Sequence, residues 1–142
     1  MTNRVAFDAD VLIYAADRGH PLGAPVAALV AESAEADHTC IGSLLLLPEV
    51  LAKPMRDDPD SDETTALLSL LSRLDLRSID EPTARLALVL ASKYGLRAAD
   101  ATHLATAVAA GAEWFITNNR KDFPQSVAEI DIVYPDHLPG YA

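Results

Sequence analysis

Short apolar runs alternate along the chain with longer segments in which apolar residues recur at helical spacing. The short runs are typical of buried strands, and the longer segments indicate amphipathic helices between them. The expected strands are Val5–Phe7, Thr39–Ile41, Leu76–Ile79, Trp114–Ile116 and Ile130–Val133. The expected helices are Val11–Ala16, Ala24–Ala36, Leu44–Ala52, Thr64–Leu74, Glu81–Tyr94 and Ala98–Ala110. This alternation predicts an α/β fold whose mainly parallel sheet is covered on both faces.

Capping and breaking residues set several of the expected boundaries. Pro21 is suited to the start of a helix, and Ser43 is suited to cap the segment that begins at Leu44. Pro48 within that segment suggests a kink or a late start of the helix, and Pro54 is expected to end it. Gly95 and Gly111 follow the last two helices, where glycine favours termination.

The length and composition indicate one folded domain over residues 1–142. The chain has 142 residues, of which 50% are hydrophobic, enough for a sizeable core. No apolar stretch reaches the length of a membrane span, and Asp8 and Asp10 interrupt any apolar region of a signal peptide. The single cysteine, Cys40, excludes an intramolecular disulfide. We therefore expect a cytoplasmic protein that does not contact a membrane.

The formal net charge of −10 limits the possible partners. It argues against a protein that coats nucleic acid generally, because phosphate binding relies on Lys and Arg. It is compatible with a nuclease that has a basic rim and a central metal ion, and equally with a protein that binds a basic partner.

Polar residues follow two of the expected strands. In open α/β sheets, ligands bind beyond the carboxyl ends of the strands. Asp8 follows the first strand, and the segment 117–122 (Thr-Asn-Asn-Arg-Lys-Asp) follows the fourth. Both ends face one crevice if the strands are parallel and close, which makes Asp8 a candidate functional residue. The alternative is a turn aspartate that accepts backbone hydrogen bonds.

Glu49 and Asp100 are further candidates. Glu49 lies in the apolar run 44–51, where burying a carboxylate is costly unless it is paired or bound to a metal; the alternative is an ion pair with Lys53. Asp100 opens a helix, where an acid can simply cap the helix or complement its dipole. His103 lies one turn later on the same face, and a lone histidine in an alanine-rich helix is more often packed or exposed than a ligand.

Three carboxylates favour Mg²⁺ or Mn²⁺, because hard cations prefer oxygen ligands. A zinc site is not indicated, since the four histidines lack paired ligand spacing. The acidic segment Asp58–Asp62 resembles the start of a calcium-binding EF-hand loop. It has Glu63 and Ser69 where such a loop needs Gly and Glu, so we interpret it as a solvated acidic turn.

Three segments resemble a known family. They are FDADVLIYA at 7–15, LLLLPEVLAKP at 44–54 and LRAADATHLATAVAAGAEWFITNNRKDFP at 96–124. The last is the most specific, because a helix with an Asp-Ala-x-His pattern leads through glycine to a strand that ends in Thr-Asn-x-x-x-Asp-Phe. In order and spacing, the chain resembles the PIN-domain nucleases, in particular the small VapC-like toxins of toxin–antitoxin pairs.

The resemblance implies a three-layer α/β/α sandwich with a central, mainly parallel sheet. It also implies an endoribonuclease that hydrolyses RNA phosphodiester bonds with Mg²⁺ or Mn²⁺ as cofactor. By position, the first three acidic residues of the family are Asp8, Glu49 and Asp100. A cognate antitoxin and a homodimer are further implications.

The chain departs from the family at two positions. Asn119 stands at the fourth acidic position and brings no charge, which favours one metal ion over two. Asp122 could substitute for it if the loop bends back. Asp10 stands where the family often has Asn or Ser, and it either restores negative charge or begins the following helix.

These residues suggest a division of roles. Asp8 and Asp100 are expected to anchor the ion, Glu49 to bind the ion or its water, and Thr117 and Asn119 to orient a water or a phosphate. Such an ion activates water and offsets charge on a phosphoryl oxygen. The further substrate-binding candidates are Asn118, Lys53, Arg56, Arg97, Arg120 and Lys121. Each Lys and Arg in this list could equally be an ordinary charged residue of the surface.

Two alternative functions remain open at this point. Asp8 and Asp10 form the Asp-x-Asp pattern of a haloacid-dehalogenase-type phosphatase, in which Asp8 would be the nucleophile, although Val11 and Leu12 replace the usual Gly-Thr. The neutral Asn119 motivates the other alternative, a catalytically weakened PIN-like module that binds RNA.

Overall fold

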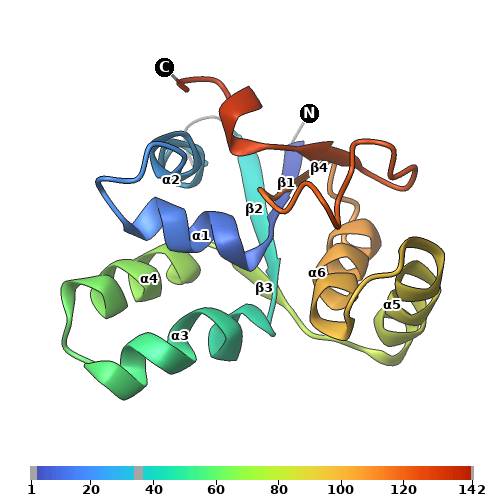
Figure 1. Ribbon diagram of the computed structural model, residues 1–142, viewed down its shortest axis with the longest axis horizontal. Coiled ribbons are helices and arrows are strands. Elements are labelled where there is room, and N and C mark those ends of the chain that lie inside the picture. The colour runs from blue at the N-terminus through green and yellow to red at the C-terminus, as the bar shows by residue number, and fades with distance from the viewer. Residues whose placement is uncertain (1–2, 34–36, 142) are drawn as a thin grey trace.

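The computed structural model, which describes residues 3–33 and 37–141, has a sheet of five parallel strands at its centre (Figure 1). The strand order is β3-β2-β1-β4-β5. The strands are β1 (Asn3–Phe7), β2 (His38–Ser43), β3 (Asp75–Arg77), β4 (Trp114–Ile116) and β5 (Asp131–Val133). The parallel sheet predicted from the sequence is confirmed, and β1 lies at its middle.

Helices cover both faces of this sheet (Figure 1). They are α1 (Ala9–Ala16), α2 (Gly23–Ala31), α3 (Leu46–Asp57), α4 (Asp62–Ser72), α5 (Glu81–Tyr94) and α6 (Ala98–Ala109), followed by the short 3-10 helix η1 (Pro135–His137). Helices α1 to α4 contribute to one apolar core and α5 and α6 to the other. The fold is therefore the expected three-layer α/β/α sandwich.

The central strand β1 separates the two cores. Because successive side chains of a strand point to opposite faces, Val5 and Phe7 join the core under α1 to α4, whereas Ala6 joins the core under α5 and α6. All three are buried. The chain leaves β1 at the edge of the sheet where the carboxyl ends of the strands lie, and this edge carries the candidate site.

Several predicted boundaries are confirmed. Helix α5 ends at Tyr94 because Gly95 adopts a left-handed conformation, with φ of 66°, and its N–H donates to the carbonyl of Ala91. Asp80 caps the start of this helix through a 2.9 Å hydrogen bond from the Thr83 N–H. Strand β4 has the predicted bounds.

Helix α3 starts later and ends later than the predicted segment Leu44–Ala52; the late start agrees with the one that Pro48 suggested, whereas the predicted end at Pro54 is wrong. The helix begins at Leu46, because the Ser43 hydroxyl accepts the N–H of Leu45 in the preceding turn. Pro54 lies inside the helix, which continues to Asp57. A proline inside a helix removes one N–H donor and crowds the carbonyl four residues before it, but the Pro54 carbonyl still accepts the N–H of Asp58 at 2.8 Å.

The first two helices also differ from their predicted bounds. Helix α1 begins at Ala9, two residues early, because Asp8 caps it. Helix α2 begins at Gly23, just after Pro21, and ends at Ala31, while residues 34–36 of the predicted helix lie outside the described residues. Gly23 is required where it is, since a Cβ there would lie 2.0 Å from the Tyr14 carbonyl oxygen.

In the part of the chain that the structure describes, no helix combines the length and the apolar character needed to cross a bilayer.

Candidate functional site

Asp8 is held rigidly where strand β1 ends. Its backbone N–H continues the strand pairing by donating to the Ile116 carbonyl at 2.9 Å. One carboxylate oxygen accepts the N–H of Ala9, and the other accepts the hydroxyl of Thr117 at 2.8 Å. The side chain is buried, and burial raises the pKa of this carboxyl although the Thr117 hydrogen bond opposes the shift. Asp8 therefore does accept a backbone hydrogen bond, as the alternative interpretation expected, and it also caps α1; neither contact excludes a role in the site.

The loop that follows β4 is fastened to the same place. Thr117 is buried, and its hydroxyl also accepts the N–H of Asn119 at 3.1 Å. Asp10 reaches this loop and accepts the N–H of Asn118 at 3.1 Å, while its other oxygen accepts the N–H of Val11. The two strand ends that the sequence placed at one crevice are thus joined by hydrogen bonds.

Asn119 and Asp122 form a reciprocal pair within this loop. The Asn119 side-chain amide donates to Asp122 Oδ2 at 3.0 Å, and the side-chain oxygen Oδ1 of Asn119 accepts the Asp122 backbone N–H at 3.3 Å. Phe123 follows and is fully buried, and its backbone N–H donates to the backbone carbonyl of Asn119. The loop therefore folds on itself between Asn119 and Asp122, while the substitution of Asp122 for the missing acid stays a prediction.

Glu49 reaches the site from α3 and meets His103 on α6. His103 Nε2 lies 2.5 Å from Glu49 Oε2, and the imidazole is fully buried. Glu49 itself is exposed, so the expectation that its apolar neighbours in sequence would enclose it is wrong. The alternative ion pair with Lys53 is not formed either, because Lys53 bonds Asp57 at 2.8 Å.

His103 is the residue that the sequence interpretation left out of the site. The signal was its position one helical turn after Asp100 on the same face of α6. Nothing in the sequence alone connected it to Glu49, which is 54 residues away.

Asp100 lies in the first turn of α6 and faces the other acids. Arg97, not Asp100, occupies the N-cap position, so Asp100 does not cap the helix, although its place in the first turn fits the alternative that it complements the helix dipole. Burial raises the pKa of Asp100, and the negative charges of Asp8, Asp122 and Glu49 raise it further. The carboxylates from four separate segments thus lie within electrostatic reach of one another.

Asp10 is a further carboxylate of this site, and its pKa is strongly raised. Burial, followed by the charge of Asp8, raises its pKa from 3.8 to about 7. Asp100 adds a smaller contribution in the same direction. A nearby cation would relieve this repulsion between ionised carboxylates.

The donor chemistry of this cluster fits an oxygen-preferring divalent ion. Within residues 3–33 and 37–141, no three His, Cys, Asp or Glu groups are arranged to enclose an ion by themselves. Mg²⁺ typically takes one or two protein carboxylates and keeps several waters, so a closed protein cage is not needed. Asp8, Asp100 and Glu49 are the residues that would hold it.

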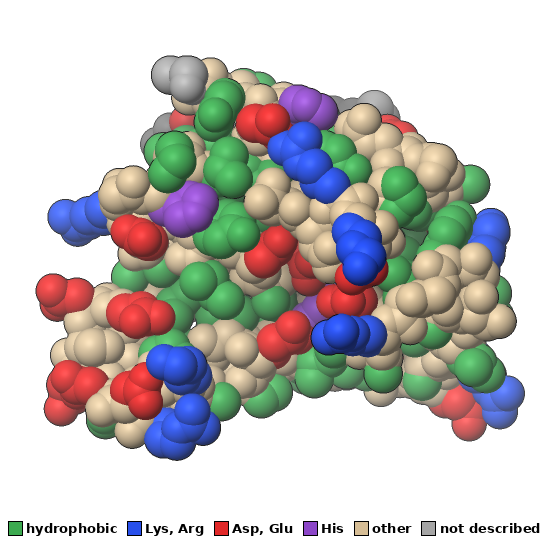
Figure 2. Space-filling model, in the orientation of Figure 1, with side chains coloured by type: hydrophobic (Ala, Val, Ile, Leu, Met, Phe, Trp, Pro, Cys, Tyr) green, Lys and Arg blue, Asp and Glu red, His purple; other side chains and the backbone are tan. Residues whose placement is uncertain are grey.

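Basic side chains group on one side of the acidic cluster. Figure 2 shows acidic side chains around a hollow near the centre of this face, with Lys and Arg side chains beside it. Arg97 and Lys121 are exposed; Arg97 lies three residues before Asp100, and Lys121 directly precedes Asp122. Arg120 is more restrained, because it pairs with Asp136 and lies 4.3 Å over the ring of Tyr134.

Lys53 and Arg56 lie further from the cluster. They follow Glu49 by up to two turns of α3, roughly 10 Å along the helix axis. Both are exposed. Lys53 is one turn from Glu49 on the same side of α3, and Arg56 is a further turn away, so their part in substrate binding stays a prediction.

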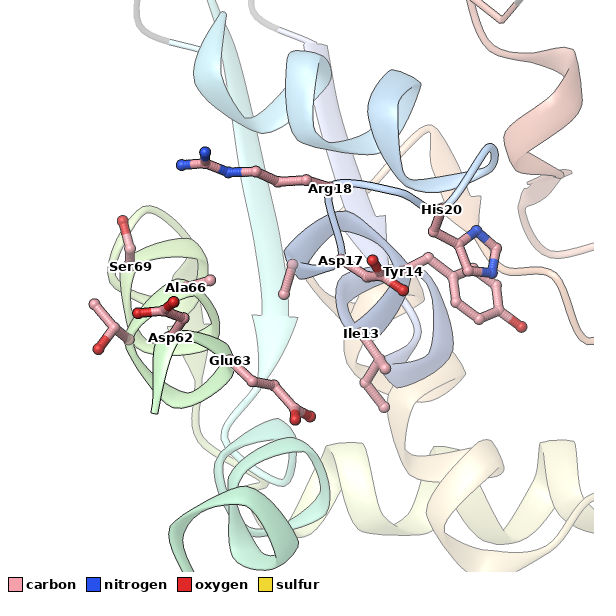
Figure 3. A pocket seen from close by; sticks show the side chains of 11 residues that line it. Ile13, Tyr14, Asp17, Arg18, His20, Asp62, Glu63, Ala66 and Ser69 are labelled. Atoms are coloured by element: carbon pink, nitrogen blue, oxygen red, sulfur yellow. The ribbon is translucent and has the colours of Figure 1, made fainter. Parts of the chain in front are cut away.

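A pocket of about 830 Å³ opens between α1 and α4 (Figure 3). Ile13, Tyr14 and Ala66 give it apolar walls, and Figure 3 shows Glu63 extending from α4 toward α1. The charged residues of the lining are Asp17, Arg18, Asp62 and Glu63, with His20 stacked 4.1 Å from Tyr14. The acidic turn at 58–62 is exposed as predicted, and Ser61 in it caps α4.

The fold matches chains from several solved structures. A toxin–antitoxin complex from Klebsiella pneumoniae is 25% identical, with a TM-score of 0.66 over 92% of this chain and 97% of that chain. VapBC2 from Rickettsia felis, bound to a promoter DNA fragment, is 17% identical with a TM-score of 0.72 over 92% and 98%. FitAcB from Neisseria gonorrhoeae is 19% identical with a TM-score of 0.68 over 94% and 99%. The comparison with curated protein sequences gave no match.

The sequence itself matches the PIN domain family over residues 5–128. This span includes every residue of the acidic cluster and both layers of helices. The match favours a nuclease over the phosphatase that the Asp-x-Asp pattern also allowed. The chain therefore belongs to the PIN domain family.

Proposed function

We propose that this protein is an Mg²⁺- or Mn²⁺-dependent endoribonuclease and the toxin of a toxin–antitoxin pair. The observation that carries the proposal is the convergence of buried Asp8 with Glu49 and Asp100 beyond the carboxyl ends of the strands. Charges crowded in this way are stable together only with a cation or with bound protons. A family of nucleases provides the matching chemistry.

Each residue has a distinct role in this proposal. Asp8 and Asp100 hold the divalent ion, and Glu49 binds it directly or through a water. When bound, the ion supplies an activated water and neutralises charge on the phosphoryl oxygen. Thr117 positions Asp8, since its hydroxyl already bonds that carboxylate.

The RNA backbone is proposed to follow the basic side of the cluster. Arg97 and Lys121 are exposed there and have donors suited to phosphate oxygens. Arg120 and the exposed part of Asn118 border the same edge. The remaining acids, Asp10 and Asp122, increase the negative charge around the ion rather than contact RNA.

Cleavage of a defined RNA by the purified protein tests the proposal. We expect cleavage with Mg²⁺ or Mn²⁺, none after EDTA treatment, and none with Asp8→Asn. Glu113→Gln is the matched control, because Glu113 is an exposed acid at the opposite end of β4 and should leave activity unchanged. Activity that survives both EDTA and Asp8→Asn would contradict the proposal.

The weakened RNA-binding module is distinguished by metal affinity. Calorimetry that shows RNA binding but no binding of Mg²⁺ or Mn²⁺ would favour that module. The specific observation behind it is the neutral Asn119, whose amide is occupied by Asp122.

The pocket between α1 and α4 is the proposed docking surface for an antitoxin. Apolar walls suit a buried side chain, and the excess of carboxylates from Asp17, Asp62 and Glu63 suits a basic segment.

The homodimer and the cytoplasmic location expected from the sequence remain predictions, and sedimentation of the purified chain would test the first.

Co-purification with the product of the neighbouring reading frame tests the partner. Changing both Asp62 and Glu63 to Lys should reduce capture, whereas Glu113→Lys changes the charge elsewhere and should not. Equal capture by both variants would place the partner on another surface.

A further inference from the structure

The contact between Glu49 and His103 joins the two helical layers at the edge of the sheet. Glu49 belongs to α3, which packs in one core, and His103 belongs to α6, which packs in the other. The imidazole is 0% exposed, whereas the Glu49 side chain is 33% exposed. A buried group therefore fixes a partly exposed one.

The hydrogen-bonding pattern also assigns the proton of the imidazole. Nε2 faces a carboxylate oxygen, which can only accept when it is ionised, so Nε2 carries the hydrogen. Nδ1 is buried and has no hydrogen-bond partner among the described residues. A second proton there would be a buried donor without an acceptor, at a cost of about 1–3 kcal/mol. The arrangement thus favours the tautomer protonated at Nε2.

We propose that His103 is a positioning residue for Glu49, a role that rests on the proposed function. The imidazole holds Oε2, and this leaves Oε1 to face the divalent ion or one of its waters. A free glutamate on an exposed helix samples many rotamers, and fixing it only when the ion binds would reduce affinity. Carboxylates that bind metal ions are commonly held in this way by a hydrogen bond from a neighbouring residue.

Calorimetric titration with Mn²⁺ alone tests this role. His103→Phe keeps a ring of similar size but removes the donor, and we expect Mn²⁺ affinity to fall by about 10- to 100-fold. His103→Gln retains an N–H that can reach Glu49, and it should recover most of that loss. Thermal unfolding of both variants reports whether they remain folded.

A double-mutant cycle separates positioning from packing. In a Glu49→Ala background, His103→Phe should produce no further loss of Mn²⁺ affinity, because the group that it positions is gone. An equal loss in both backgrounds would show that His103 acts through packing, and would overturn the proposal. If the wild-type protein does not bind Mn²⁺ at all, the proposed function fails instead.

The imidazole itself provides an independent measurement. Proton–nitrogen NMR of the wild-type protein without metal should show the hydrogen on Nε2, and Glu49→Ala should shift that signal. A hydrogen on Nδ1, or a signal unaffected by Glu49→Ala, would contradict the contact. This readout also remains available if His103→Phe does not fold.

Discussion

The Thr117 hydroxyl donates a 2.8 Å hydrogen bond to Asp8 across 109 positions of the chain. The two residues follow Ile116 and Phe7, which pair in the sheet between β4 and β1. The register of these strands therefore places the Thr117 hydroxyl, a neutral donor, beside the buried carboxylate of Asp8. This bond opposes the rise in the Asp8 pKa that burial causes.

Thr117→Val should destabilise the protein by about 1–3 kcal/mol, because Asp8 and the Asn119 N–H both lose a buried partner. Urea denaturation measures the change. Thr117→Ser keeps the hydroxyl and should stay closer to the wild type. If Val is tolerated and Ser is not, the methyl group matters and the hydroxyl does not.

Asp10 should make stability depend on pH. Its pKa is about 7 in the folded protein against 3.8 ordinarily, so the folded state binds more protons between these values. The free energy of unfolding therefore falls as pH rises from about 4 to 7, by at most about 4 kcal/mol for this group. Below pH 4 the group has no effect, and above pH 7 the loss is complete.

Asp10→Asn removes this titration and should flatten the stability profile between pH 4 and 7. Denaturation at several pH values in EDTA measures it. Asp131→Asn, which changes an exposed acid on β5, should leave the profile as it is. An unchanged slope in Asp10→Asn would mean that Asp8 and Asp100, whose pKa values are also raised, dominate the profile.

Asn119→Asp should destabilise the loop after β4 when metal is removed. The new carboxylate would face Asp122 in place of the amide donor, at a cost of about 1–3 kcal/mol. Added Mn²⁺ should raise the melting temperature of this variant more than that of the wild type. Asn119→Ala loses the same bond without adding charge, and it should not show the extra gain.

Gly23→Ala should destabilise the packing of α1 on α2. The added Cβ would meet the Tyr14 backbone oxygen at 2.0 Å, and backbone cannot move aside as a side chain can. We expect a loss of about 1–3 kcal/mol in thermal unfolding. Gly19→Ala is the control, because its nearest neighbour would be a side-chain atom at 3.6 Å.

The sequence predicted the layers and most elements because their signals are local. Alternating strands and helices specified a covered parallel sheet, and Gly95 marked the end of α5. Pro54 misled the prediction, since a proline forbids only one hydrogen bond and the helix continued around it. Local sequence signals thus predicted which helices and strands form more accurately than they predicted where each one begins and ends.

The candidate site was predictable only as a set of residues. Asp8 could be placed because strand ends meet at one edge. The partners of Glu49 and Asn119 could not, because they depend on how α3 and α6 approach and on how one loop folds back. Tertiary contacts of this kind leave no periodic pattern in a sequence.

The strand order has a consequence for the protein during its synthesis. Strand β1 is made first, yet one of its two neighbours, β4, begins only at Trp114. A nascent chain on the ribosome can pair β1 with β2 early, but the Asp8–Thr117 hydrogen bond cannot form until β4 and Thr117 have been made. A truncated product that ends before β4 therefore keeps Asp8 but lacks the partner that holds its carboxylate.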